Sequence, residues 1–156
     1  MSGMERILDE MMFRFPMILG IIFLDEDGFP IATAGDYSLD VDGLGPTIAY
    51  CYKFHAQMGM EMRMSLESVV VDFDKMRFCQ CSLPNGTLTV LAEAGVKLGM
   101  IRFITRKIKN KLESFMKERE AERKIVPEEP RLKLPSEEEI RSIIARLESE
   151  SLHGLR

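Results

Sequence analysis

Residues 17–34 read MILGIIFLDEDGFPIATA, two apolar runs separated by a short acidic turn. Such a pair of runs around a turn that ends in glycine predicts a β-hairpin, with strands over residues 17–24 and 29–34. Gly28 suits the turn because glycine adopts a positive φ without steric cost. The acidic residues do not continue as a calcium-binding loop, which spreads oxygen ligands over about twelve residues and closes with a glutamate. We therefore interpret the segment as a structural hairpin and expect no metal there.

A helix is expected before this hairpin. Between residues 4 and 15, apolar side chains recur every three or four positions, and charged side chains occupy the opposite side. This is the pattern of an amphipathic helix. Pro16 ends the helix, because proline disfavours helical backbone in the residue that precedes it.

A second helix is expected after the hairpin. One apolar stripe at steps of three and four comprises Leu44, Ile48, Cys51, His55 and Met58. Tyr50 and Phe54 add a second apolar pair four residues apart, so the apolar sector is wider than contact with one sheet requires. Gly59 is placed as the C-terminal cap. A helix that is apolar on two flanks needs two packing partners, and we expect the second to be another subunit.

Three further strands and a third helix follow. Residues 66–73, 77–83 and 87–94 are strand-like, and the Asn-Gly pair before the last of them is a strong hairpin signal. Residues 98–116 then resume helical spacing. The order helix, two strands, helix, three strands, helix predicts an α+β fold. In it, a five-stranded antiparallel sheet with strands grouped 2+3 packs against flanking helices in two layers.

The remainder of the chain has a different composition. Residues 117–135 are mostly charged and contain three prolines, which predicts a linker, either extended or the frayed end of the preceding helix. Ser136 followed by Glu139 is a capping-box pattern, and it opens an amphipathic helix over residues 136–151. The narrow apolar stripe of this tethered helix comprises Ile140, Ile143, Ile144 and Leu147.

Composition and charge limit the class of partner. The chain of 156 residues is 46% hydrophobic, and 21 Lys and Arg oppose 25 Asp and Glu, a net charge of −4. An acidic balance argues against binding of nucleic acid. No apolar stretch reaches the roughly 18 residues of a membrane span, and the first residues lack the pattern of a signal peptide. With three cysteines and twelve methionines, we expect a cytoplasmic protein with no nucleic-acid partner and no membrane insertion.

Motifs for catalysis are missing from the sequence. There is no Walker-type phosphate loop, no serine nucleophile elbow and no cluster of acid–base groups around the two histidines. We therefore expect no catalytic residue, no cofactor and no resident metal.

One set of residues leaves a zinc site open as an alternative. Cys51 and His55 share a helix face, and Cys79 and Cys81 share a strand face. If that helix covered that strand, the four side chains would form a Cys3His site. Redox chemistry is a second alternative. We interpret the cysteines as buried thiols, because cysteine is among the most buried residue types.

Basic residues gather on the third long helix, where they comprise Arg102, Arg106, Lys107, Lys109 and Lys111. They form either a solvated face that complements the helix dipole or a docking patch for an acidic protein surface. The aromatic interleaving typical of single-stranded nucleic-acid binding is absent from this stretch.

Methionines alternate along the chain at Met58, Met60, Met62 and Met64. Flexible thioethers fill irregular gaps in cores and also form adaptable recognition surfaces. We expect core filling here, with a recognition surface as the alternative.

Three strings resemble the Roadblock / dynein light chain family, over about residues 4–116. Residues 20–32 are similar to the family's hairpin of apolar strand, Asp-x-x-Gly turn, aromatic residue, Pro and Ile-Ala. Residues 66–71, followed by a strand, form the second match. Leu98-Gly99-Met100-Ile101-Arg102 is similar to the Leu-Gly-x-x-Arg that begins the family's last helix. On this basis residues 1–116 are expected to form a Roadblock-like domain.

The resemblance implies a function without catalysis. Members join two five-stranded sheets edge to edge with their second helices side by side, and many bind Ras-like small GTPases. Proteins of the bacterial and archaeal mutual gliding protein B type are the most similar in kind. We therefore expect a homodimeric adaptor or regulator of a Ras-like small GTPase. A structural scaffold like the dynein light chains, with no GTPase involved, is the alternative.

Two candidate surfaces follow from these arguments. A strand with three successive valines is an aggregation hazard at an exposed sheet edge, and pairing with its symmetry mate removes that hazard. The expected dimer interface comprises Tyr50, Phe54, Val69, Val70 and Val71. The expected second partner contact is the stripe of Ile140, Ile143, Ile144 and Leu147, which alternatively folds back on its own domain.

Overall fold

The computed structural model describes residues 2–36, 38–125 and 136–153. Its elements follow the predicted order: α1 (Gly3–Arg14), β1 (Ile18–Asp25), β2 (Pro30–Gly35), α2 (Val41–Glu61), β3 (Val69–Asp72), β4 (Met76–Leu83), β5 (Gly86–Glu93), α3 (Leu98–Ile125) and α4 (Glu137–His153). The chain divides into two compact units, Met1–Glu120 and Ala121–Arg156. The sheet and the candidate surface on α2 belong to the first unit, and α4 belongs to the second.

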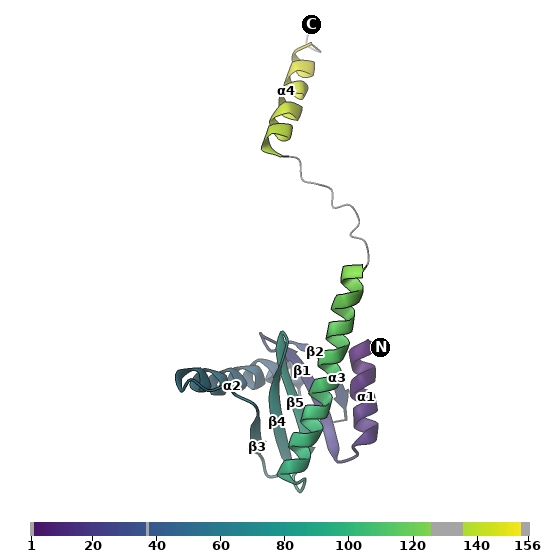
Figure 1. The fold of residues 1–156 in the computed structure, drawn as a ribbon, viewed down its shortest axis with the longest axis vertical. Helices are drawn as coiled ribbons and strands as arrows, with labels where there is room; N and C mark the ends of the chain where they lie inside the picture. Colours follow the sequence, from purple (N-terminus) through teal and green to yellow (C-terminus); the bar gives the residue numbers. More distant parts are fainter. Residues whose placement is uncertain (1, 37, 126–135, 154–156) are drawn as a thin grey trace. The chain divides into compact units, whose positions relative to one another are not determined.

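The five strands form one antiparallel sheet in the order β2-β1-β5-β4-β3. This confirms the α+β fold with strands grouped 2+3. Three hairpin connections place consecutive strands side by side, and β1 pairs with β5, so β2 and β3 become the two edges. α2 is the crossover that carries the chain from the β2 edge to the β3 edge (Figure 1).

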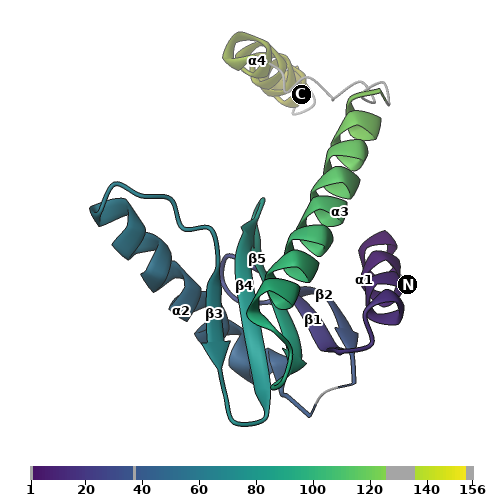
Figure 2. The same ribbon diagram turned by 60° about the horizontal axis from the view of Figure 1, so that its bottom comes forward.

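Helices cover both faces of the sheet (Figures 1 and 2). On one face, buried side chains of α1 and α3 pack on the strands, among them Leu8, Met11, Ile104 and Ile108. On the other face α2 contributes Ala49 to a smaller cluster with Ile22, Leu24 and Leu91. The sheet is therefore the middle of three layers, one more than the sequence predicts, because α2 crosses on the face opposite α1 and α3.

The turn of the first hairpin is built around Asp25. Its Oδ1 accepts hydrogen bonds from the backbone N–H groups of Asp27 and Phe29, both at 2.9 Å. Gly28 has a φ of +89°, in the region that favours glycine. The acidic residues thus shape a turn, which confirms the predicted hairpin.

The starts of α1 and α4 are set by serine caps. The Ser2 hydroxyl accepts from the backbone N–H of Glu5 at 3.2 Å, and the Glu5 carboxylate accepts from the Ser2 backbone N–H at 3.3 Å. The Ser136 hydroxyl accepts from the Glu139 N–H at 3.3 Å, which confirms the predicted start of α4. α3 continues to Ile125, so the first part of the predicted linker is helical, and residues 126–135 lie outside the described residues.

The predicted end of α2 at Gly59 is wrong. The helix continues to Glu61, and its C-cap is Met62. Gly59 is buried because the chain returns over it: the Met64 N–H donates to the Gly59 carbonyl at 2.8 Å. A Cβ on Gly59 would lie 2.9 Å from the Met64 carbonyl oxygen, so this glycine serves a close approach inside the helix.

Candidate interaction surface on α2 and the β3 edge

α2 packs on the sheet through small residues. Gly45 and Ala49 are buried, and a Cβ on Gly45 would lie 2.1 Å from the carbonyl oxygen of Gly28 in the hairpin turn. Tyr52 is also buried, and burial raises the pKa of its hydroxyl against the opposing effect of a hydrogen bond with Ser82. The helix backbone therefore approaches the sheet closely along this side.

The stripe expected to pack on the sheet is the wrong one. Its members Leu44, Cys51, His55 and Met58 are exposed, and only Ile48 is half-buried. Hydrophobic periodicity selects large apolar side chains, whereas the packed side of α2 carries glycine and alanine, which score weakly. Apart from Val41, Ile48 and Tyr52, the larger apolar side chains of α2 are left on the free side of the helix.

Tyr50 and Phe54 form an exposed aromatic pair on that free side. Their side chains are 63% and 54% exposed, and their ring centroids lie 4.9 Å apart in an edge-to-face arrangement. A single exposed apolar residue is ordinary, but contiguous apolar surface marks sites of interaction. The predicted surplus of apolar surface on α2 is therefore present, and its role as an interface stays a prediction.

Four methionines extend this apolar surface to the end of α2 and beyond. Met58, Met60, Met62 and Met64 are 54%, 77%, 55% and 60% exposed, so the expectation that they fill the core is wrong. The reason is the position of the helix, whose C-terminal end extends past β3 and away from the sheet (Figure 2). We call Tyr50, Phe54 and these four methionines the α2 apolar surface.

β3 is the edge strand past which the C-terminal end of α2 extends. It spans Val69–Asp72, shorter than the predicted 66–73, because residues 66–68 do not pair with β4. All three valines are half-buried, and Val70 packs against the cluster under α1 and α3. Strand alternation turns Val69 and Val71 to the α2 face. Within the described strands, the outer edge of β3 has no hydrogen-bonded neighbour.

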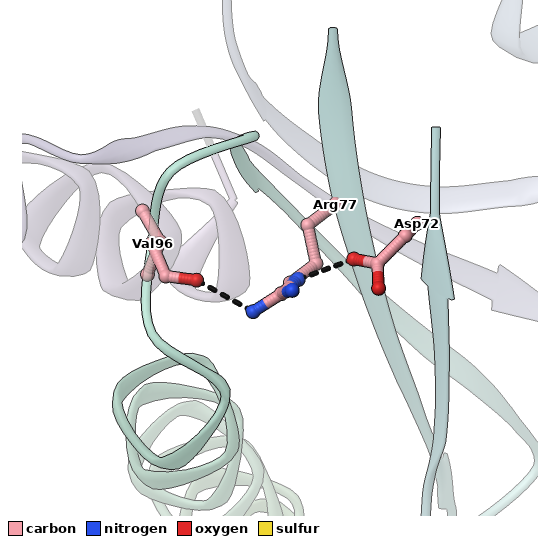
Figure 3. Close-up of polar contacts among 3 residues, drawn as sticks. All are labelled: Asp72, Arg77 and Val96. Atoms are coloured by element: carbon pink, nitrogen blue, oxygen red, sulfur yellow. Dashed lines mark hydrogen bonds and ion pairs between the residues drawn. The ribbon is translucent and has the colours of Figure 1, made fainter. Parts of the chain in front are cut away.

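Arg77 fastens this edge strand to the domain (Figure 3). Its Nε pairs with the Asp72 carboxylate on β3, and its Nη1 donates to the backbone carbonyl of Val96 at 2.6 Å. One side chain on β4 therefore links the edge strand to the segment that leads into α3.

The residues of the zinc alternative lie on opposite faces of the sheet. Cys79 and Cys81 are buried in the cluster under α1 and α3, whereas Cys51 is exposed on α2. The His55 Nδ1 instead lies 2.9 Å from the Cys51 carbonyl oxygen. In the described parts of the chain, no three His, Cys, Asp or Glu side chains are grouped to hold a metal ion. The zinc arrangement required α2 to cover β4 on the thiol side, and α3 occupies that side.

Solved structures share this architecture. The Roadblock/LC7 domain from Streptomyces avermitilis has a TM-score of 0.65 at 15% identity, with 74% of this chain and 98% of the domain covered. Myxococcus xanthus MglB has a TM-score of 0.67 at 14% identity, with 75% and 97% covered. A structure described as MglB with tetrameric arrangement has a TM-score of 0.65 at 12% identity, with 76% and 93% covered. The chain has the Roadblock/LC7 fold.

No family model and no curated protein matches the sequence, so the Roadblock/LC7 fold rests on the structural comparison. The match spans nearly all of each Roadblock/LC7 domain or MglB chain and about three quarters of this one. A shared fold does not assign an activity. The features of this chain that bear on function are therefore the α2 apolar surface and the β3 edge.

The second unit carries an apolar stripe of its own. On α4, Ile140, Ile143, Ile144 and Leu147 are 43%, 53%, 49% and 60% exposed. They recur at helical spacing on one side of α4, whose first turn is acidic. In the part of the chain that the structure describes, none of the helices combines the length and apolarity needed to cross a bilayer.

Proposed function

We propose that the chain is a homodimeric adaptor or regulator of a Ras-like small GTPase and supplies no catalytic group of its own. The observation that carries the proposal is the α2 apolar surface beside the unpaired, valine-rich edge of β3. Both features are costly on an isolated subunit, because exposed apolar patches and bare strand edges promote association.

The proposed dimer pairs β3 with its symmetry mate across a twofold axis. Such an isologous contact satisfies the free backbone groups of both edges at once. Because the end of α2 extends past β3, pairing of the edges would place it over the partner's half of the joined sheet. Tyr50 and Phe54 would then pack between the two α2 helices, and burial of each large side chain contributes about 1.5–3 kcal/mol.

Two findings support the regulatory part of the proposal. The chain shares its fold with MglB, and one MglB structure is described as a tetrameric arrangement. The sequence resemblance to Roadblock proteins implies GTPase binding. A regulator without catalytic groups acts by binding one conformation of the GTPase switch segments better than another, and it shifts that equilibrium by the difference in affinity.

α4 is the proposed second contact. An exposed stripe of three isoleucines and a leucine on one side of a helix is the pattern of a helix that docks in a groove. In this proposal α4 binds the GTPase while the first unit forms the dimer platform, so the two contacts lie on separate elements.

The test uses the full-length protein as bait in native lysate, with guanosine diphosphate or a non-hydrolysable triphosphate analogue added. We expect recovery of a Ras-like GTPase, with affinity for one nucleotide state at least about tenfold higher, a difference of about 1.4 kcal/mol. Equal recovery in both states would support a scaffold without regulation. A failure to recover any GTPase would contradict the proposal.

A further inference from the structure

A cavity of about 680 Å³ lies on the face of the sheet opposite α2. It is bounded by α3, by β4 and by the segment just before β3. Its lining residues are Leu66, Glu67, Ser68, Cys79, Cys81, Arg102, Thr105, Arg106, Lys109 and Asn110. This cavity is separate from the α2 apolar surface, and neither the dimer nor the GTPase proposal depends on it.

Three cations line one wall of the cavity. Arg102, Arg106 and Lys109 stand at positions i, i+4 and i+7 of α3, so they share one side of the helix. The helical rise places the backbones of the two arginines about 6 Å apart along the axis, with Lys109 about one turn further. The cavity wall is therefore a short row of positive charge.

Two carboxylates lie near this row of three cations. Glu67 lines the same cavity, and the Glu113 carboxylate lies 3.9 Å from the Lys109 ammonium. Within residues 2–36, 38–125 and 136–153, neither arginine forms an ion pair within 4.0 Å. The two guanidinium groups are thus the charges of the cavity that no carboxylate neutralises at close range.

The floor of the cavity adds no anion. Cys79 and Cys81 are 0% and 4% exposed. Burial raises the pKa of both thiols, that of Cys81 to about 12, so both stay protonated at neutral pH. The Thr105 hydroxyl donates to the Ile101 carbonyl at 2.7 Å. The floor is therefore neutral and compact, below a positive wall.

We propose that this cavity binds a small molecule bearing phosphate or carboxylate groups, with Arg102 and Arg106 holding the anionic group. Guanidinium groups bind carboxylate and phosphate through paired hydrogen bonds, which is why arginine predominates at such sites. The volume falls within the roughly 300–1,000 Å³ typical of small-molecule sites. The residues beneath the arginines, Cys79, Cys81 and Thr105, are buried, so a bound ligand would contact the arginines at the mouth of the cavity and not the strand.

The test is titration calorimetry of the full-length protein with two probes in separate arms, inorganic pyrophosphate and citrate, at constant ionic strength set by chloride. We expect saturable binding of at least one probe. The double variant Arg102→Gln/Arg106→Gln should weaken it at least about tenfold. The variant Arg102→Lys/Arg106→Lys keeps the charge but loses the paired geometry, so it should also weaken binding, by a smaller factor.

The matched control is Lys107→Gln/Lys111→Gln. Both lysines are exposed on the same helix and do not line the cavity. The double substitution removes the same amount of positive charge as the substitution of the two arginines by glutamine. Arg102 and Arg106 are exposed as well, but unlike the two lysines they line the cavity. Affinity of the control should therefore stay within about twofold of the parent, because its lysines form no hydrogen bonds with a ligand held there. Thermal unfolding of each variant verifies that it is folded.

Each outcome decides the proposal. Binding of pyrophosphate alone or of citrate alone supports it and distinguishes phosphate from carboxylate as the recognised group. Equal weakening by the cavity pair and the control pair overturns it, because the charge then acts as a diffuse field. It is also overturned if neither probe saturates at millimolar concentration, including the case in which only a glutamate-rich peptide binds.

Discussion

Arg77 donates a hydrogen bond of 2.6 Å from its Nη1 to the backbone carbonyl of Val96, while its Nε pairs with Asp72 (Figure 3). The first contact reaches the segment before α3, and the second reaches the edge strand. Arg77 is only 20% exposed at its side chain, so part of this pairing is shielded from water. The edge on which the proposed dimer depends is thus held in place by a neighbouring strand.

Replacement of this arginine should loosen the edge. We expect Arg77→Ala to lower the free energy of unfolding by about 1.5–3 kcal/mol, because it removes hydrogen bonds from a charged donor. Asp72→Asn keeps the bond to Val96 and removes a pair whose carboxylate side chain is 64% exposed, so it should cost less than about 1 kcal/mol. Urea unfolding measures both, and equal losses would show that the Val96 contact contributes nothing.

The close crossing of α2 over the hairpin turn should tolerate no added methyl group. In Gly45→Ala the new Cβ would meet the Gly28 carbonyl oxygen, so we expect a loss of about 1–3 kcal/mol from overpacking. Gly99→Ala is the matched control, because a Cβ at Gly99 in α3 has no neighbour within 4 Å. It should be neutral or stabilising by up to about 1 kcal/mol. If both substitutions changed the free energy of unfolding equally, α2 would not approach the Gly28 carbonyl as closely as the structure shows.

The α2 apolar surface should determine the oligomeric state. We expect Tyr50→Ser/Phe54→Ser to weaken dimerisation at least about a hundredfold, because two large apolar side chains per subunit lose their burial. Phe13→Ser is the control, since Phe13 is 91% exposed on α1 and lies on a different element. Sedimentation equilibrium at micromolar concentration measures the effect. A parent protein that is monomeric there would contradict the dimer itself.

Cys81 should make stability depend on alkaline pH. Its thiol pKa in the folded chain is about 12, against an ordinary value of 9.0. Between these values the unfolded chain releases this proton and the folded chain retains it. The free energy of unfolding should therefore fall as pH rises above about 9, by up to about 1.4 kcal/mol per pH unit for this group.

Two variants assign that slope to Cys81. In Cys81→Ala, urea unfolding at about pH 8 and about pH 10.5 should show a flatter dependence, although its stability at the lower pH also falls. Cys51→Ala removes an exposed thiol and should keep the parent slope. A Cys81→Ala slope equal to that of the parent would mean that the thiol titrates normally in the folded protein.

Deletion of residues 126–156 tests the proposed role of α4. We expect affinity for the captured GTPase to fall while the melting temperature stays within a few degrees of the parent value. The reason is that the stripe on α4 would be buried only against the partner. Unchanged affinity together with a lower melting temperature would instead show that α4 stabilises its own domain.

Much of the fold follows from local sequence signals. The Asp-Glu-Asp-Gly turn predicts the first hairpin because Gly28 and the Asp25 carboxylate satisfy the turn by themselves. The Ser136 cap sets the start of α4 in the same way. Each of these features depends on residues within a few positions of one another, so one sequence suffices to place them.

The side of α2 that packs was decided by a contact between distant parts of the chain. Gly45 in α2 approaches Gly28 in the hairpin turn, and the hydrophobicity of a glycine gives no sign of such a contact. The exposure of the four methionines has a separate tertiary cause, because the C-terminal end of α2 extends past β3 and away from the sheet. Hydrophobic periodicity therefore located the helix correctly and chose the wrong face.

By itself, the sequence determined the order of the elements, the grouping of the strands and the valine-rich edge, because these depend on turn chemistry and on periodicity within each segment. Only the tertiary structure decided which cysteines lie together, which face of α2 is free and that Arg102 and Arg106 face a cavity. Each of these depends on the side of the sheet to which a helix crosses. That choice is made by the packing of residues far apart in the chain, and no local pattern encodes it.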